Sequence, residues 1–400
     1  MHLAVTLEHR FECTPDGTVW TEIMFDYPFW RRYLEVFDRV SIIARAREVP
    51  EAKPTWKRVD GERVSFCSVP LFVGPHEYLT KAWQVRRAIR AAAMPSDAVI
   101  LRTPGVISFA ATRELLTARR PFCLEIVADP YDLFAPGCVD SPFRPYFRWR
   151  FTRQLRRQCA EASGVSYVTE HAIQRRYPAK AGVFATHYSD VELSDAAFAS
   201  APRPPVQRGG AITLVHLGSF NLLYKGQDVL VAALSTCLRW GLDLRLVFVG
   251  DGRHRQQVEA QAKTRGLMDR VSFLGQLPAG EAPREQLDRA DLFVLPSRAE
   301  GLPRAMIEAM ARGLPCVGST AGGIPELLAP EDMVPPDDAA ALARKIREVT
   351  SDPERMARSS ARNLERARLY HANALREPRN RFYQHVRETA TQKANLQHPS

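Results

Sequence analysis

Two glutamates in the carboxyl-terminal half of the chain have the spacing of a binding site. Glu300 follows the apolar stretch 292–295, which is typical of a buried strand, and enters a glycine-containing turn. Pro303 suits the first position of a helix, which places Glu308 about one and a half turns further along. The two carboxylates are therefore expected to line the same edge of a cleft. The alternative is an i,i+4 pair of Arg304 with Glu308 on an exposed helix face, which would contribute only a few tenths of a kcal/mol.

Two further segments carry groups that can bind anions. Lys225 lies in the segment 218–226, directly after a predicted strand. It is either a cation for a bound anion or a solvated side chain beside a helix start. Gly322 and Gly323 precede the segment 324–326, which is expected to open a helix. Bare backbone amides at a helix amino terminus attract anions, and a simple tight turn is the other interpretation of the two glycines.

The elements that must position these residues alternate between strands and helices. In the second half of the chain, apolar runs that end in small or turn residues predict strands at 212–217, 244–249, 271–274, 292–295 and 316–317, before helices at 338–349 and 353–370. The first half repeats the pattern, with strands at 2–7, 40–45, 98–102, 122–128 and 164–169 and helices at 78–92, 106–119 and 143–162. Strand followed by helix, repeated, indicates parallel sheets that are covered on both faces.

A change of composition separates the two halves. Residues 191–210 are dominated by Ala, Ser and Pro and end in two glycines, which is typical of a linker. The sequence therefore predicts an α/β protein with doubly wound domains at 1–190 and 211–370, followed by a helix and tail at 371–400. Open α/β sheets bind ligands at the carboxyl ends of their strands, so the cleft between the domains is the expected site.

Composition excludes several classes of protein. Of the 400 residues, 45% are hydrophobic and 25% charged, as in folded globular proteins. The seven cysteines are scattered, which indicates neither a disulfide framework nor a Cys-x-x-Cys metal site and favours a reducing compartment. The amino terminus lacks leading positive charges, and no apolar run of about 18 residues occurs, so neither a secretory signal nor a spanning helix is predicted. The net charge of +10 is larger in the first half and would attract phosphates, nucleic acid or anionic lipid.

The stretch from Glu300 to Glu308, Glu-Gly-Leu-Pro-Arg-Ala-Met-Ile-Glu before Ala-Met-Ala, resembles the Glu-x7-Glu signature of the family 4 retaining glycosyltransferases. The likeness is strong across 211–336 and only architectural across 1–190. It implies the GT-B architecture, in which two Rossmann-like domains face an interdomain cleft. By this resemblance, Glu308 accepts hydrogen bonds from the ribose of a nucleotide sugar, and Glu300 holds the donor sugar near its anomeric carbon and diphosphate. The adjoining residues of the same donor site would be Gly301 and Leu302.

The segment 218–226 resembles a second element of that family, in which relatives show Gly-Arg-x5-Lys-Gly. The resemblance implies that Gly218 and Lys225 contact the donor, because a departing nucleoside diphosphate accumulates charge that a cation stabilises. Ser219 stands where the family has its arginine, which removes a bidentate phosphate partner. Compensation is expected from Arg298 or from an arginine of the first domain.

The resemblance also places Gly250 near the nucleotide base, and Gly322 and Gly323 against the phosphates or the donor sugar. As plain turns, these glycines need no ligand. No Asp-x-Asp occurs in the chain, and this is the carboxylate pair that usually holds a divalent metal in the other major glycosyltransferase fold. The sequence therefore predicts no metal and no cofactor, with Lys225 and backbone amides in place of the cation.

Candidates in the first domain follow its predicted strands. The loop after the first strand, which contains Gly17, is expected to overhang the cleft. Arg102, Asp129 and Asp132 are expected to meet the donor sugar or the acceptor hydroxyl. Asp129 either takes part in the chemistry or caps a loop, as an Asp before Pro commonly does. His171 either reaches the cleft or has a structural role near a helix start.

A basic and aromatic segment stands apart from these candidates. Between Arg144 and Arg157, six arginines interleave with four aromatic side chains. A helix of this kind either lies on an anionic membrane surface or buries its aromatic side chains and leaves its arginines in solvent. Nucleic acid is not expected as a partner, because no recognition motif accompanies the charge.

Together, these features predict a cytoplasmic, metal-independent hexosyltransferase, peripheral on the inner face of the membrane. It would move a sugar from a nucleoside diphosphate sugar to a saccharide or lipid-linked acceptor, in bacterial polysaccharide or glycolipid assembly. Retention of the anomeric configuration follows from the family resemblance alone. The alternative, motivated by Ser219, is a catalytically silent subunit of a glycosyltransferase complex that binds nucleotide or membrane.

Overall fold

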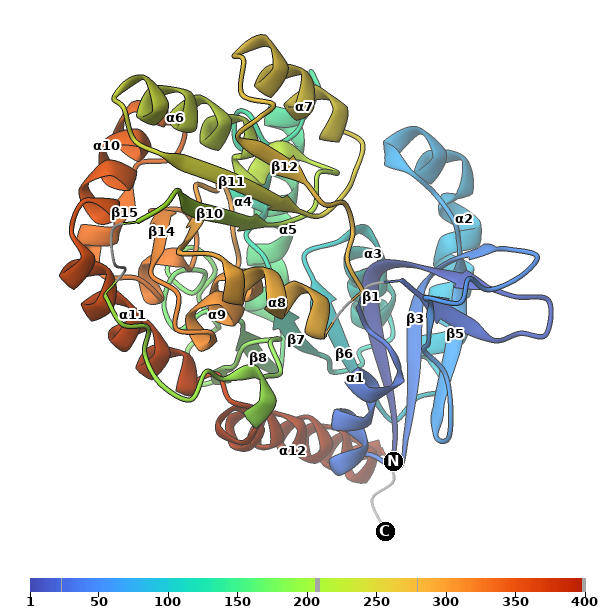
Figure 1. Ribbon diagram of the computed structural model, residues 1–400. Coiled ribbons are helices and arrows are strands. Elements are labelled where there is room, and N and C mark those ends of the chain that lie inside the picture. Colours follow the sequence, from blue (N-terminus) through green and yellow to red (C-terminus); the bar gives the residue numbers. More distant parts are fainter. Residues whose placement is uncertain (23, 206–208, 279, 398–400) are drawn as a thin grey trace.

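The chain folds into two α/β domains, and its last helix returns to the first domain (Figure 1). The structure, a computed structural model, describes residues 1–22, 24–205, 209–278 and 280–397. The strands of the amino-terminal domain are β1 (His2–Cys13), β2 (Val19–Thr21), β3 (Arg39–Glu48), β4 (Lys57–Arg58), β5 (Val64–Pro70), β6 (Ala98–Thr103), β7 (Cys123–Ile126), β8 (Gly164–Tyr167) and β9 (Phe184–His187). Its helices are α1 (Tyr27–Arg31), α2 (Gly74–Ala93), α3 (Val106–Thr117), α4 (Pro130–Leu133) and α5 (Arg144–Glu161), with the 3-10 turn η1 (Arg32–Glu35).

The carboxyl-terminal domain repeats the same plan. Its strands are β10 (Ile212–Leu217), β11 (Leu244–Val249), β12 (Val271–Phe273), β13 (Leu292–Leu295), β14 (Cys316–Ser319) and β15 (Met333–Val334). Its helices are α6 (Gln227–Arg239), α7 (Arg255–Thr264), α8 (Glu281–Arg289), α9 (Arg304–Ala311), α10 (Ala339–Thr350) and α11 (Pro353–Arg368). The 3-10 turns are η2 (Asp195–Ala197) in the linker, η3 (Leu223–Lys225), η4 (Ile324–Glu326) and η5 (Pro330–Asp332), and the chain ends in α12 (Ala372–Gln397).

Parallel pairing dominates both sheets. In the described residues of the second domain, the strands follow the order β12-β11-β10-β13-β14-β15, and every neighbouring pair is parallel. Strands such as β13 are buried along their whole length, which explains their continuous apolar sequence. In the first domain, β1 pairs in parallel with β3 and β6, and β5 extends the sheet beyond β3. The prediction of an α/β protein with two doubly wound domains is confirmed.

The ends of several helices follow directly from the sequence. Asp338 precedes α10, and its side chain accepts a hydrogen bond from the backbone N–H of Ala341. Asp352 precedes α11 in the same way, and Pro353 occupies the first helical position. These caps satisfy backbone donors that have no partner inside a helix. They fix the starts of the two helices that close the second domain.

The linker and α12 tie the domains together. Arg203, in the predicted linker 191–210, donates hydrogen bonds to the backbone carbonyls of Leu287 and Arg312 in the second domain. The linker residues 206–208 and the tail residues 398–400 lie outside the described residues. Helix α12 confirms the predicted additional helix, and it packs on the first domain, where Tyr383 stacks on Tyr33 with ring centroids 4.6 Å apart. The carboxyl-terminal segment is therefore part of the amino-terminal domain in space.

Candidate functional site

The order of strands in the second sheet reverses at β10. From β10 the chain runs outward through β11 and β12, and it then returns to place β13 on the other side of β10. The connections that leave β10 and β13 diverge, which opens a crevice at the carboxyl edge of the sheet. Gly218 and Ser219 follow β10, and Arg298 and Glu300 follow β13. The fold thus brings together two segments that lie about eighty residues apart in the sequence.

Lys225 and Glu300 form a buried ion pair in this crevice. Lys225 Nζ lies 2.7 Å from Glu300 Oε1, and the Ser297 hydroxyl donates to the same oxygen at 2.7 Å. The two charged side chains are only 13% and 6% exposed. Burial by itself would lower the pKa of Lys225, but the adjacent Glu300 carboxylate outweighs it and raises that pKa. Lys225 is therefore a fixed cation at the switch point, and the solvated alternative is wrong.

A glycine after Lys225 makes this placement sterically feasible. Gly226 has φ 73° and begins α6 after the single turn η3. A Cβ atom at this position would lie 2.2 Å from the carbonyl oxygen of Pro296. Only glycine combines a left-handed conformation with so close an approach of two backbones. The turn holds Lys225 next to the segment after β13.

Glu308 lies on α9 and keeps its carboxylate free for a ligand. Its side chain is partly buried and, within the part of the chain that the structure describes, makes no hydrogen bond or ion pair. Desolvation raises the pKa of Glu308, and the positive charges of Arg304 and Arg284 only partly offset this effect. The alternative ion pair between Arg304 and Glu308 is not formed. A desolvated carboxylate with open acceptor positions can accept hydrogen bonds from two hydroxyl groups.

Arg304 is a cleft residue that the sequence did not single out for function. It is the first residue of α9, and its guanidinium contacts the sulfur of Met24 in the opposite domain. Its charge also acts on both Lys225 and Glu308. The only sequence signal for Arg304 is its position between the two glutamates, which also fits an i,i+4 pair with Glu308.

The glycines between and after the glutamates allow close backbone approach. A Cβ atom at Gly301 would lie 2.4 Å from the carbonyl oxygen of Val127 in the first domain. At Gly322, with φ 53°, it would lie 2.0 Å from the carbonyl oxygen of Glu300. Gly301 therefore marks a point where the two domains touch. Leu302, next to it, is 9% exposed and packs in the core.

The predicted pair of bare amides is only partly present. The N–H of Gly323 donates to the carbonyl oxygen of Gly301 at 2.8 Å, so it is not available to an anion. The segment 324–326 forms the single 3-10 turn η4 and does not open an α-helix. The prediction of a helix amino terminus at this point is wrong, because Gly322 and Gly323 are needed to pack the segment after β14 against the segment after β13.

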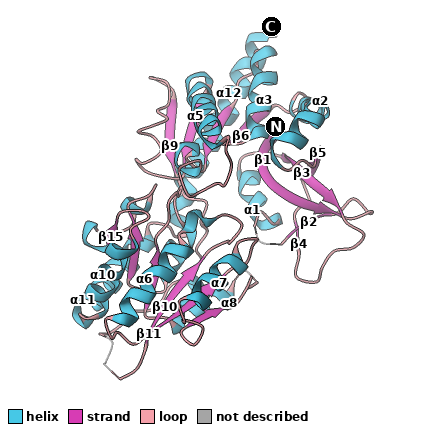
Figure 2. Cartoon of the chain, turned by 90° about the horizontal axis from the view of Figure 1, so that it is seen from above, coloured by secondary structure: helices cyan, strands magenta, loops and turns pink. Residues whose placement is uncertain are grey.

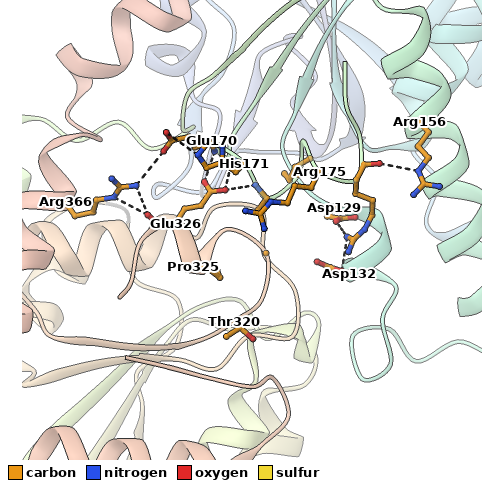
Figure 3. Close-up of a pocket in the computed structure, with 14 residues that line it drawn as sticks. Asp129, Asp132, Arg156, Glu170, His171, Arg175, Thr320, Pro325, Glu326 and Arg366 are labelled. Carbon is orange, nitrogen blue, oxygen red and sulfur yellow. Dashed lines mark hydrogen bonds and ion pairs between the residues drawn. The ribbon is translucent and has the colours of Figure 1, made fainter. Parts of the chain in front are cut away.

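A cavity of about 770 Å³ lies between the domains beside this crevice (Figure 3). The first domain contributes Asp129, Asp132 and His171 to its lining, and the second contributes Gly322 and Thr320. Four arginines also line it: Arg156, Arg175, Arg176 and Arg366. The structure therefore gathers three of the first-domain candidates at one place, facing the second domain, and His171 reaches the cleft with an exposed side chain.

Of the two roles proposed for Asp129, catalysis or the capping of a loop, the structure shows the capping role. Its carboxylate accepts a hydrogen bond from the backbone N–H of Tyr131 at 2.8 Å and another from the Tyr177 hydroxyl at 2.7 Å. The remaining oxygen pairs with Arg176. Arg176 also lies 3.1 Å from a carboxylate oxygen of Asp132. Since its acceptor positions are occupied, Asp129 positions the cavity wall and is not set up to take a proton.

Glu326 links the two domains directly. Its carboxylate accepts hydrogen bonds from the backbone N–H groups of Glu170, His171 and Ala172, at 2.7, 2.9 and 2.7 Å. The side chain belongs to the second domain and the three donors belong to the first (Figure 3). No sequence pattern predicts this contact, because the partners of Glu326 are backbone atoms.

Around Gly218, the remaining donor-site candidates pack tightly. A Cβ atom at Gly250 would lie 2.1 Å from the carbonyl oxygen of Gly218, so glycine is needed there whether or not a ligand binds. The Ser219 hydroxyl accepts the N–H of Asn221 at 3.2 Å and stays within its own loop. His216, three residues before Ser219 in β10, is buried, and its ring nitrogen Nδ1 lies 2.9 Å from the carbonyl oxygen of Val294.

Gly17 and Arg298 do not occupy their predicted places. Strand β1 continues to Cys13 and joins β2 through a tight hairpin, so Gly17 lies at a turn and the predicted overhanging loop is absent.

Arg298 donates to both carboxylate oxygens of Asp228, at 2.9 and 2.7 Å, and also pairs with Asp337. Because its guanidinium is held by two carboxylates, Arg298 does not replace the missing phosphate partner at Ser219.

Arg102 is a core residue and not a cleft residue. Its side chain is 2% exposed and pairs with the buried carboxylate of Glu125 and the partly buried carboxylate of Asp190. Burial by itself would raise the pKa of Asp190, but Arg102 and Arg32 outweigh it and lower that pKa to about 2. The prediction that Arg102 meets a substrate is wrong, because its strand β6 lies inside the sheet and the side chain is needed to neutralise two buried acids.

Replacement of Arg102 by methionine tests the structural role of this residue. We expect Arg102→Met to lower the free energy of unfolding by about 3–5 kcal/mol, because the buried Glu125 loses its ion-pair partner and Asp190 keeps only Arg32. Urea unfolding followed by circular dichroism measures this change. The exposed Arg113→Met on α3 serves as the control and should change stability by less than about 0.5 kcal/mol. Equal stability of the two variants would contradict the structural role of Arg102.

Comparison with known proteins finds relatives of the chain. Residues 202–366 match the family described as glycosyl transferases group 1. Protein CapJ of Staphylococcus aureus is 26% identical over 324 residues, which are 81% of this chain and 80% of that protein. A GDP-mannose-dependent alpha-(1-6)-phosphatidylinositol monomannoside mannosyltransferase of Mycolicibacterium smegmatis is 32% identical over 143 residues, 33% of this chain and 37% of that one.

Solved structures show the same fold along the chain. Sucrose-phosphate synthase from Thermosynechococcus elongatus superposes with a TM-score of 0.72 at 19% sequence identity, covering 97% of this chain and 99% of that one. Among the described residues, no helix is long and apolar enough to cross a membrane. The chain therefore has the fold of the GT-B glycosyltransferases, and its residues 202–366 match the glycosyl transferases group 1 family.

Proposed function

We propose that this protein is a glycosyltransferase that moves a sugar from a nucleoside diphosphate sugar to a saccharide or lipid-linked acceptor, with retention of configuration and without a metal ion. The observation that carries the proposal is the buried pair of Lys225 and Glu300, 2.7 Å apart, in the crevice where the strand order reverses. Glu308 lies on α9 with its carboxylate unpaired in the described residues, and the positive charge of Arg304 acts on both Lys225 and Glu308. One crevice thus holds cations that can bind a diphosphate and a carboxylate that can bind hydroxyl groups, as a nucleotide sugar requires.

The relatives support this donor and acceptor class. The mannosyltransferase of Mycolicibacterium smegmatis is named for a GDP-mannose donor and a phosphatidylinositol-linked acceptor. A colanic acid biosynthesis glycosyltransferase of Escherichia coli, named as putative, is 34% identical over 131 residues. We therefore place the reaction in polysaccharide or glycolipid assembly.

In the proposed reaction, the bond between the anomeric carbon and the diphosphate oxygen breaks, and its electron pair goes to the diphosphate. The acceptor hydroxyl oxygen bonds to the same face of the anomeric carbon and passes its proton to the leaving diphosphate. Lys225 stabilises the charge that develops on that diphosphate, and Glu300 holds both Lys225 and the sugar. No protein base is needed, in keeping with the occupied carboxylate of Asp129.

Contacts between the domains would keep water out of the reaction. Gly301 approaches Val127, and Glu326 binds three backbone N–H groups of the first domain. A donor held between the domains is thereby shielded from hydrolysis while the acceptor enters through the cavity that Asp132 and His171 line. The domains would open to admit the donor and close on it.

A nucleotide screen tests the donor site. We expect one of UDP, GDP, ADP and TDP to raise the thermal unfolding temperature, because a ligand at 100 times its dissociation constant adds roughly 2.7 kcal/mol to the folded state. The shift should be the same with magnesium and with EDTA if Lys225 and backbone groups balance the diphosphate charge. A shift that EDTA abolishes would contradict the metal-free mechanism. No shift with any nucleotide would contradict the donor site itself.

A catalytically silent subunit is the second candidate, and Ser219 favours it. The hydroxyl of Ser219 is held within its own loop, and Arg298 is held by Asp228 and Asp337, so neither supplies a bidentate phosphate contact. Slow donor hydrolysis in the absence of acceptor, present in the natural chain and absent in Lys225→Met, would establish an enzyme. A chain that binds a nucleoside diphosphate tightly but neither hydrolyses nor transfers any matching sugar would be the silent subunit.

A further inference from the structure

Three helices of the first domain lie next to one another on its sheet. α2 follows β5, α3 follows β6 and α5 follows β7, and each leads to a parallel strand. These crossovers advance in the same direction along the sheet, so their usual right-handedness places all three helices on the same face. α3 contacts both α2 and α5, and Figure 2 shows α5, α3 and α2 in turn across the domain. The outer helices α2 and α5 therefore flank one surface.

Large apolar side chains project from both outer helices. Leu79 and Trp83, one turn apart on α2, are 74% and 70% exposed. Tyr146 and Trp149, one turn apart on α5, are 49% and 61% exposed, and Phe143 before them is 65% exposed. Leu79, Trp83 and Phe143 have the largest exposed fractions of any large apolar side chain described. Nothing in the fold of the single chain explains their exposure.

The aromatic side chains of α5 divide into two sets. Phe147 and Phe151 turn inward, where both pack against Phe134 with ring centroids 5.9 and 5.2 Å away. Tyr146 and Trp149 turn outward. The helix therefore buries one pair of its aromatic side chains, and only the outward pair is open to a partner.

The same surface is strongly basic. α2 carries four basic side chains and one acidic one, and α5 carries six arginines and one glutamate. Arg150, Arg153 and Arg157 are exposed and make no ion pair or hydrogen bond within the described residues. By contrast, Arg148 is tied down, because it donates to the carbonyl oxygen of Tyr131 at 2.8 Å and stacks on that ring. Arg87 lies 5.4 Å from the ring of Trp83, so charge and aromatic surface meet on α2 as well.

We propose that the outer faces of α2 and α5 form a docking surface for an anionic lipid bilayer. Trp and Tyr side chains favour the boundary between lipid headgroups and acyl chains, and arginines favour the lipid phosphates around them. A nucleic acid would use the charge but would leave Leu79 and Phe143 in water. α5 also contributes Arg156 to the interdomain cavity, so this docking surface sets the cavity beside the bilayer. Resting on the proposed function, this position suits an acceptor whose lipid remains in the membrane.

Vesicle co-sedimentation tests the docking surface without using enzyme activity. We expect the natural chain to bind vesicles of equal parts phosphatidylglycerol and phosphatidylcholine at least tenfold more tightly than phosphatidylcholine alone, with binding lost at high salt. Arg150→Glu with Arg153→Glu should weaken that binding at least tenfold. Trp83→Ala with Trp149→Ala should weaken it and should leave the residual binding entirely salt-sensitive.

Matched variants separate this surface from general charge and from unfolding. Lys263→Glu with Arg344→Glu changes the net charge equally on exposed residues of the second domain, and it should leave vesicle binding unchanged. All variants should keep the thermal unfolding temperature of the natural chain. Equal loss in both charge pairs would overturn the proposal, as would binding that is indifferent to the tryptophan changes or tighter to a DNA duplex than to anionic vesicles. Because nucleotide binding is measured separately, failure here leaves the donor site untouched.

Discussion

Lys225→Met is expected to lower the rate of sugar transfer by about 10²- to 10³-fold, the largest effect of any single change in the crevice. The side chain is the buried cation of the site, 2.7 Å from Glu300, and its pKa is raised by that carboxylate. It is therefore charged throughout the physiological pH range. Removing it takes away the charge that stabilises the departing diphosphate. Initial transfer rates measure the loss, with a nucleotide sugar that carries the nucleoside diphosphate identified by the nucleotide screen.

Control variants distinguish this effect from damage to the fold. Lys225→Met leaves the Glu300 carboxylate buried without its cation, which destabilises the folded chain. The double variant Lys225→Met with Glu300→Gln should regain stability but not activity. Lys263→Met, at an exposed lysine of the same domain, should transfer at the natural rate. If the double variant regained activity, Lys225 would be a structural partner of Glu300 and nothing more.

Glu308→Ala is expected to weaken the binding of the preferred nucleoside diphosphate by roughly ten- to a hundredfold, because hydrogen bonds to a charged group contribute about 1.5–3 kcal/mol each. The carboxylate on α9 is desolvated and without a partner in the described residues, so the ribose hydroxyls would be its first strong donors. Isothermal titration of the variant and of the natural chain measures the change in dissociation constant.

A ligand change tests whether the ribose is the group that Glu308 holds. The natural chain should prefer the ribonucleoside diphosphate to its 2′-deoxy analogue, and Glu308→Ala should bind both equally. A preference that survives in Glu308→Ala would place the ribose elsewhere. Pyrophosphate, which lacks a ribose, should bind the variant and the natural chain alike.

Binding through Glu308 should also depend on pH. Because desolvation raises the pKa of Glu308 above the ordinary value of 4.5, its carboxylate takes up a proton at a higher pH than an exposed glutamate does. The protonated form accepts hydroxyl hydrogen bonds more weakly, so affinity should fall as the pH falls through this raised pKa. Glu308→Gln should lack this component and retain only the titration of the nucleotide phosphates, which makes it the reference for the measurement.

The sequence was sufficient for the regular elements of the second domain. Strands 212–217, 244–249 and 292–295 were predicted with their observed bounds, because each is a mostly apolar run that is followed by Gly or Pro. The first domain was harder, since β1 continues through a bulge after Thr6 and pairs with β2 beyond it. The short strands β2 and β4 and the edge strands β5 and β9 carry too few apolar residues to be recognised alone.

The candidate site residues also fall into two groups, those that short motifs predicted and those whose partners lie far away in the sequence. The Glu-x7-Glu and Lys-Gly segments were recognisable because each holds its candidate residues within about ten positions of the chain. Arg102, Arg298 and Asp129 were misjudged or left open because their partners lie far away in the sequence. An arginine that ends in a buried ion pair and one that ends in a cleft have the same local surroundings.

By itself, the sequence determined the fold class, the division into two domains and the absence of the arginine at Ser219, and it predicted the residues of a donor crevice. Those properties follow from local periodicity, composition and short motifs. Only the tertiary structure decided that Lys225 pairs with Glu300, that Glu326 links the domains and that α5 turns two aromatic residues inward and two outward. The reason is physical: burial, desolvation and the closure of a cleft depend on contacts between residues far apart in the chain, and no local pattern encodes them.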